Sequence, residues 1–184
     1  PAKATRARRL VQKMQALSAA GCSSCEPDLY TYQTWIHACS RTRGGVPQTM
    51  QILNYLEDQA AAGNHALRPN THCLAAAIHA WAYSYEPYKA ERAYELLQDM
   101  RQRYEIYGQT FCRLNVVVFT SVINACVKPA TEEERSAAFD IAQRTFDELV
   151  DSPYGNPNFL TYAAFLHVCA TALDEGSVAR EAAI

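Results

Sequence analysis

Three histidines are the residues of this sequence whose chemistry stands out first. His37, His79 and His167 occupy equivalent places in three similar segments, so their side chains could form one column. A zinc ion shared by the column is not expected, because packed helices lie about 8–10 Å apart whereas a Zn–N bond measures about 2.0–2.1 Å. We therefore predict a polar column of side chains and no metal site.

Cys22 and Cys25 form a Cys-x-x-Cys pair, a spacing found in zinc sites and in redox-active disulfides. A zinc site needs two further ligands, and the sequence has no second close pair of cysteines. A redox pair usually lies in a thioredoxin-like βαβ unit, which this sequence does not predict. Reduced loop thiols are the favoured interpretation. Most of the seven cysteines fall inside apolar helical segments, which indicates reduced packing residues and an intracellular or organellar compartment.

Motifs that would support catalysis are missing from the sequence. It has no glycine-rich phosphate loop, no His-Glu-x-x-His and no Gly-x-Ser-x-Gly. The acidic run Glu132-Glu133-Glu134 falls where a helix is expected to begin, and acids are favoured there by the helix dipole. We expect no enzyme activity, no cofactor and no small-molecule substrate. A catalytic domain elsewhere in a longer chain is left open.

The composition is ordinary for one globular domain, with 184 residues of which 49% are hydrophobic and 20% charged. No stretch reaches the roughly 18 apolar residues of a membrane span, so we expect no membrane insertion. The net charge is −2, yet residues 1–20 contain five basic residues and no acid. A solvated helix face and a phosphate-binding face are equally open interpretations of this basic start.

Two landmarks recur along the chain at the same intervals. The first is an aspartate or asparagine, the second is the end of a short segment such as Ile36-His37-Ala38-Cys39. The first set is Asp28, Asn70, Asn115 and Asn158, and the second set is Cys39, Trp81, Cys126 and Cys169. Both sets are spaced 42, 45 and 43 residues apart. Such a fixed period is typical of repeat proteins, and each Asp or Asn is expected to cap the start of a helix.

The apolar residues that follow each landmark recur with the period of an amphipathic helix. Positions 4, 7, 8 and 11 after the Asp or Asn are apolar in all four segments, which predicts one buried helical face. These positions are Tyr32, Trp35, Ile36, Cys39, Leu74, Ala77, Ile78, Trp81, Phe119, Val122, Ile123, Cys126, Tyr162, Phe165, Leu166 and Cys169. A second amphipathic helix follows in each complete unit, and residues 1–20 match its pattern.

The sequence therefore predicts an all-α chain in which pairs of helices are stacked. We expect units at residues 29–70, 71–115 and 116–158, with partial units at 1–28 and 159–184. Because the chain begins and ends within a unit, we expect it to be part of a longer array.

The segments Pro27–Ile36, Asn115–Ile123 and Asn158–Ala163 resemble the opening of a pentatricopeptide repeat, and Tyr94–Met100 resembles the second helix of that repeat. The resemblance covers nearly the whole chain. It implies an α-solenoid of antiparallel helix-turn-helix repeats in a right-handed superhelix. The units are longer than is usual in that family, which indicates enlarged loops near residues 60–68 and 104–113. HEAT-like repeats, with units of about 40–47 residues, are the alternative fold.

The resemblance also implies a function, namely binding of single-stranded RNA in a mitochondrion or chloroplast, for RNA processing, stability or translation. Positions 2, 5, 9 and 13 after each landmark would contact bases and phosphates, and position 5 would act with the Asn that closes its unit. The implied RNA-binding residues are Tyr30, Gln33, His37, Arg41, Asn70, His72, Ala75, His79, Asn115, Val117, Thr120, Asn124, Lys128, Asn158, Leu160 and Ala163.

Not every unit fits this scheme equally well. Thr120 with Asn158 is a combination that accompanies adenine in the family, whereas Ala75 and Ala163 have no side-chain donor or acceptor with which to read a base. The weak base-reading pairs, and the acidic balance after residue 20, leave a second function open. That alternative is a protein-interaction scaffold inside an organellar ribonucleoprotein or ribosome.

Overall fold

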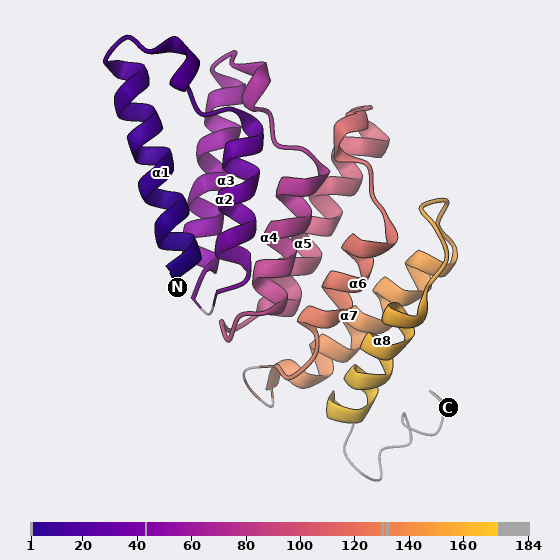
Figure 1. The fold of residues 1–184 in the computed structure, drawn as a ribbon. Helices are drawn as coiled ribbons and strands as arrows, with labels where there is room; N and C mark the ends of the chain where they lie inside the picture. The colour runs from indigo at the N-terminus through magenta and orange to yellow at the C-terminus, as the bar shows by residue number, and fades with distance from the viewer. Residues whose placement is uncertain (1, 43, 130, 132, 173–184) are drawn as a thin grey trace.

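The computed structural model describes residues 2–42, 44–129, 131 and 133–172, and all regular secondary structure in this part is helical (Figure 1). The predicted all-α class is therefore confirmed. The α-helices are α1 (Ala2–Ala19), α2 (Leu29–Ser40), α3 (Val46–Ala61), α4 (Thr71–Ala82), α5 (Lys89–Arg101), α6 (Val116–Ala125), α7 (Glu133–Val150) and α8 (Phe159–Ala172). The expected second helix of the last unit falls at 173–184, outside the described residues.

The helices form two layers in an arrangement that is similar to a helical repeat (Figure 1). In the first layer α2 packs on α4, α4 on α6, and α6 on α8. In the second layer lie α1, α3, α5 and α7, each packed against the first-layer helices next to it in the chain. The first-layer helices consequently have neighbours on several sides, and the core runs along them.

Helix starts follow from the Asp and Asn landmarks, as predicted. Asp28 Oδ1 accepts a hydrogen bond from the backbone N–H of Thr31, and Asn115 Oδ1 accepts one from Val118. Asn70 and Asn158 cap α4 and α8 in the same way. A side-chain oxygen at this position satisfies an N–H that has no partner within the helix.

The predicted buried stripe is confirmed for α2, α4 and α6, where every one of its residues is buried or half-buried. The stripe of α8 is different, because Tyr162 is 51% exposed and Leu166 is 64% exposed. Each first-layer helix before α8 is covered by the next one, as α6 is covered by α8. Within the described residues, no further first-layer helix covers α8 in this way. The pattern of the second helix predicts that Leu10 and Val11 of α1 both lie on the buried face, which is wrong for Leu10, because it is 58% exposed while Val11 is buried.

The connections between units contain a repeated turn that the sequence did not reveal. Short 3₁₀-helices occur at Ser23–Cys25, His65–Leu67 and Thr110–Cys112, each three residues before a capping Asp or Asn. Glycines with positive φ precede them at Gly21, Gly63 and Gly108. Such φ values suit glycine because it lacks a Cβ. The extra length of the units lies in these connections, together with a π-helical turn, η3 (Gln102–Ile106), that extends α5.

Within the described residues, no helix is both long enough and apolar enough to span a membrane.

Candidate nucleic-acid interface

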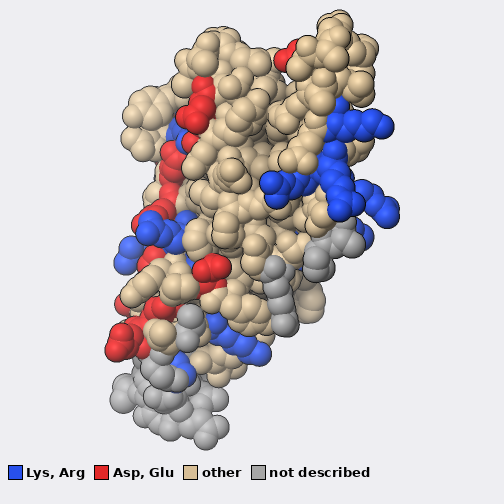
Figure 2. Space-filling model, turned by 90° about the vertical axis from the view of Figure 1, so that its left-hand side faces the viewer, with Lys and Arg blue, Asp and Glu red and all other residues tan. Residues whose placement is uncertain are grey.

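The first layer differs from the second layer in its charge. Helices α2, α4, α6 and α8 contain no Asp, Glu, Lys or Arg, whereas α3, α5 and α7 contain many carboxylates. Five basic residues of α1 are all exposed, namely Lys3, Arg6, Arg8, Arg9 and Lys13. Figure 2 shows basic side chains gathered on one side of the α1 face and acidic side chains in a row along the opposite edge. The residues of these four helices therefore bring no carboxylate that would repel a phosphate chain, whereas exposed Glu26 and Asp28 lie just before α2.

The second residue of each first-layer helix lies on the surface. Tyr30 is 75% exposed, Val117 65% and Leu160 64%, and His72 is exposed as well. Because these residues hold one register position on helices that pack side by side, they follow one another along the layer. Tyr30 and His72 carry flat rings on which a base could stack. Val117 and Leu160 offer only apolar contact.

Positions 9 and 13 of neighbouring helices come together at the other end of the layer. The rings of His79 and Tyr83 are stacked with centroids 4.3 Å apart. Burial lowers the pKa of His79, a backbone hydrogen bond with Ser40 opposes that effect, and electrostatic interaction with Arg41 and then with His37 lowers the pKa further. His79 is therefore neutral near pH 7, so Arg41 supplies the positive charge of this group.

A hollow of about 390 Å³ continues the same row between α4, α6 and α8. It is lined by Tyr83, Asn124, Lys128 and His167, which the sequence had placed at positions 9 and 13. Asn124 Nδ2 donates to the carbonyl of Thr120, which leaves its Oδ1 free to accept. Because α6 ends at Ala125, Lys128 lies beyond the helix, with a left-handed backbone at φ 52°.

Lys89 also lines this hollow and was missed by the sequence analysis. It is the first residue of α5 and is only 6% exposed, and its Nζ donates to the carbonyl of Val127 at 2.7 Å. Burial lowers the pKa of the ammonium group, and electrostatic interaction with the neighbouring Cys126 and Glu134 side chains opposes that effect. No periodic signal in the sequence marks Lys89, because it belongs to the other layer and reaches the hollow only through the packing of α5 on α6.

Position 5 lies elsewhere than expected. The helical period predicts position 5 on the side opposite the buried stripe, but Gln33, Ala75 and Thr120 are half-buried and only Ala163 is exposed. The Oγ1 of Thr120 is 2.8 Å from the Oγ1 of Thr161 on α8. Thr120 therefore shares its hydroxyl with a protein neighbour, which limits what it can offer to a base.

The capping asparagines are similarly restricted. Asn70, Asn115 and Asn158 each use Oδ1 to accept from the backbone of their own helix. In each of them Nδ2 stays available, so these side chains can donate to a ligand but are poorly placed to accept from one.

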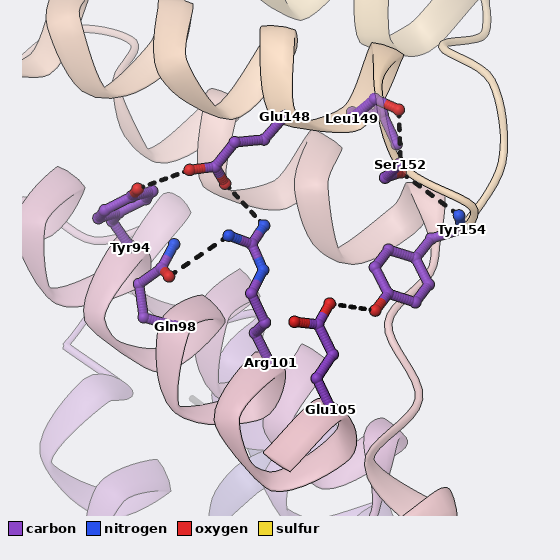
Figure 3. Close-up of polar contacts among 8 residues, drawn as sticks. All are labelled: Tyr94, Gln98, Arg101, Glu105, Glu148, Leu149, Ser152 and Tyr154. Atoms are coloured by element: carbon purple, nitrogen blue, oxygen red, sulfur yellow. Dashed lines mark hydrogen bonds and ion pairs between the residues drawn. The ribbon is translucent and has the colours of Figure 1, made fainter.

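A larger hollow of about 710 Å³ lies in the second layer, beside α5 and α7. Its lining contains Arg101 and Arg144 together with five carboxylates, namely Glu105, Asp140, Asp147, Glu148 and Asp151. Several of these groups are already bonded to one another, as Figure 3 shows for Glu148 with Arg101 and Tyr94. The excess of negative charge makes this hollow a poor site for phosphates.

Among the described residues no group of three His, Cys, Asp or Glu side chains is arranged to hold a metal ion. The chain matches no protein-family model, and comparisons with curated proteins and with solved structures found no match. A functional assignment must therefore be argued from the geometry and charge of the first layer.

Proposed function

We propose that this chain is a single-stranded RNA-binding module of pentatricopeptide type, an α-solenoid of antiparallel helix pairs that acts on RNA in a mitochondrion or chloroplast. The observation that carries the proposal is the charge of the first layer. Four adjacent helices carry no carboxylate, and the cations Arg41, Lys128 and Lys89 stand at one end of them.

The arrangement suits an extended strand better than a duplex. Two rows of groups run along the layer. Exposed side chains near the helix starts include the rings of Tyr30 and His72, and the cations Arg41 and Lys128 lie with polar groups near the helix ends. Unpaired bases can stack on Tyr30 and His72, while Arg41 and Lys128 attract phosphates. Base choice would be weak, because Thr120 is shared with Thr161 and Ala75 has no polar atom.

The test is a fluorescence-anisotropy titration of short single-stranded RNAs at two salt concentrations. We expect affinity to fall as salt rises, because bound phosphates release counterions. The double variant Arg41→Ala/Lys128→Ala should bind all sequences more weakly and lower the salt slope by about 2, one for each lost phosphate contact. Arg92→Ala is the matched control, since Arg92 is an exposed cation of the second layer. No RNA affinity, or affinity that salt leaves unchanged, would refute the proposal.

A second candidate function, a protein-interaction scaffold within a ribonucleoprotein, is favoured by the surface of α8. Phe159 is 83% exposed, and Leu160, Tyr162 and Leu166 are exposed beside it. A contiguous apolar surface of this kind marks interaction sites. If protein partners recovered from an organellar extract survive RNase treatment and are lost on Leu166→Glu, the scaffold function is supported over RNA binding.

A further inference from the structure

Two of the seven cysteines differ from the others in their surroundings. Cys39, Cys73, Cys112 and Cys126 are buried in the core, and burial raises the pKa of each thiol, to about 11 for Cys39 and about 12 for Cys126. Such thiols are inert because the reactive form is the thiolate. Cys169 on α8 is partly exposed, and burial raises the pKa of its thiol as well. Cys22 and Cys25 are also partly exposed, and they differ from the other five in lying together on the connection between α1 and α2.

The backbone of this connection holds the two thiols together. Cys22 N–H donates to the carbonyl of Leu17 at the end of α1, and Cys25 N–H donates to the carbonyl of Cys22 at 3.0 Å. The second bond closes the 3₁₀ turn Ser23–Cys25. Side chains three residues apart are eclipsed in a 3₁₀-helix. As a result the two Sγ atoms are 2.7 Å apart, within about 1 Å of the length of a disulfide bond.

We propose that Cys22 and Cys25 are a thiol–disulfide exchange site, which a low-molecular-weight disulfide such as oxidised glutathione converts reversibly into an intrachain disulfide. The proposal is independent of RNA binding. It needs no βαβ unit, because here the helix end and the 3₁₀ turn bring the sulfurs together.

The two cysteines have unequal roles in the exchange. Hydrogen bonds from Cys25 and then from Ser24 lower the pKa of Cys22, whereas the pKa of Cys25 is raised by its hydrogen bond to Cys22 and by burial. Cys22 is therefore the thiolate that attacks first, and Cys25 is the resolving thiol.

The reaction balances in two steps. The Cys22 thiolate attacks one sulfur of oxidised glutathione, which forms a mixed disulfide and expels one glutathione thiolate that takes up a proton. Cys25 then loses its proton to solvent and attacks Cys22 Sγ, which expels the second glutathione. The two protein thiols are oxidised by two electrons, and the glutathione disulfide is reduced to two thiols.

The experiment incubates the protein with oxidised glutathione, blocks the remaining thiols by alkylation and maps the peptides by mass spectrometry. In the unsubstituted protein we expect an internal Cys22–Cys25 disulfide, reversed by reduced glutathione, with Cys39, Cys73, Cys112 and Cys126 still alkylated after denaturation. Cys25→Ser should stop at the mixed disulfide on Cys22. Cys22→Ser should form its adduct several-fold more slowly.

Two results would overturn the proposal, and both come from the unsubstituted protein, so neither depends on how well a variant folds. One is that Cys22 and Cys25 are both found completely alkylated, and therefore unoxidised, after equilibration with oxidised glutathione. The other is a glutathione adduct that persists on either cysteine without conversion to the internal disulfide.

Discussion

At the scale of single residues, substitutions can separate the capping role of the asparagines from their proposed contact with RNA. Asn115 Oδ1 accepts from Val118 N–H to start α6, and its Nδ2 is the atom that would face RNA. We predict that Asn115→Ala lowers the free energy of unfolding by about 1 kcal/mol through loss of the cap. Asn115→Asp keeps a carboxylate oxygen in the cap, so its stability should stay close to that of the unsubstituted protein.

The same two variants report on binding when they are titrated with RNA. Asp at position 115 cannot donate and adds a negative charge, so Asn115→Asp should bind RNA more weakly while remaining stable in urea unfolding. If Asn115→Asp binds as tightly as the unsubstituted protein, Asn115 is a structural cap and has no contact with RNA.

His79 makes the stability of the protein depend on pH. Its folded-state pKa is lowered, first by burial, so the unfolded state binds more protons than the folded state once pH falls below about 6.5. The stability present above the unfolded pKa is therefore lost as pH falls through the folded pKa. We predict a lower urea midpoint at about pH 5 than at about pH 7, and a smaller difference in His79→Phe, whose ring can still stack on Tyr83.

The exposed histidine His72 provides the control for this pH effect, because it lies at the start of α4, a different end of the helix from His79. His72→Phe should leave the pH dependence of unfolding as it is in the unsubstituted protein. An unchanged difference between the two pH values in His79→Phe would show that other groups cause the effect.

At the scale of helices, α5 and α7 are tied together by one carboxylate. Glu148 of α7 accepts from Tyr94 Oη and from the Arg101 guanidinium of α5, each at 2.8 Å, and the Arg101 and Glu148 side chains are only 25% and 22% exposed (Figure 3). A second link joins Tyr154, after α7, to Glu105 in the π-helical turn η3. These bonds fix the spacing of the second layer where α5 and α7 meet.

We predict that Glu148→Ala lowers the free energy of unfolding by about 2 kcal/mol, because it removes two hydrogen bonds to a charged group and leaves Arg101 half-buried without its carboxylate. The neighbouring Asp147→Ala is the matched control, since Asp147 is exposed, and its effect should lie within about 0.5 kcal/mol of zero. Equal losses for both variants, measured by urea unfolding, would show that Glu148 is no tether.

The sequence predicted helix starts and buried stripes well, because both depend on local rules. A capping side chain and a 3.6-residue period are visible in any single segment, so Asn115 and the stripe of α6 could be assigned. The half-buried state of Gln33 and Thr120 could not be predicted, because it depends on the packing of neighbouring helices. For Gln33 this is the packing of α4 on α2, and for Thr120 the packing of α8 on α6. The place of Lys89 and the close approach of Cys22 Sγ and Cys25 Sγ could not be predicted either, because they arise from helix packing and from a turn without periodicity.

At the scale of the whole molecule, the charge divides the protein into two unlike layers. The carboxylates of the described α-helices all belong to α3, α5 and α7, and none belongs to the helices of the first layer. Under the proposed function, this division would let a chain with a net charge of −2 bind a polyanion. The position of each charge matters more than the net charge, because the interaction between a protein charge and a phosphate falls off over a Debye length of about 8–10 Å in ordinary buffers.

The division can be tested by adding the same charge to each layer in turn. Ala163 on α8 and Gln143 on α7 are both exposed helical residues, so Ala163→Glu and Gln143→Glu should each fold normally. We predict that Ala163→Glu weakens RNA binding several-fold, because the new carboxylate repels the phosphates. The loss should be larger at low salt, where dissolved ions screen that repulsion less. Gln143→Glu places its charge among existing acids on the far layer and should leave affinity unchanged. Equal losses for the two variants would mean that RNA senses only the net charge, and that the first layer is not its binding face.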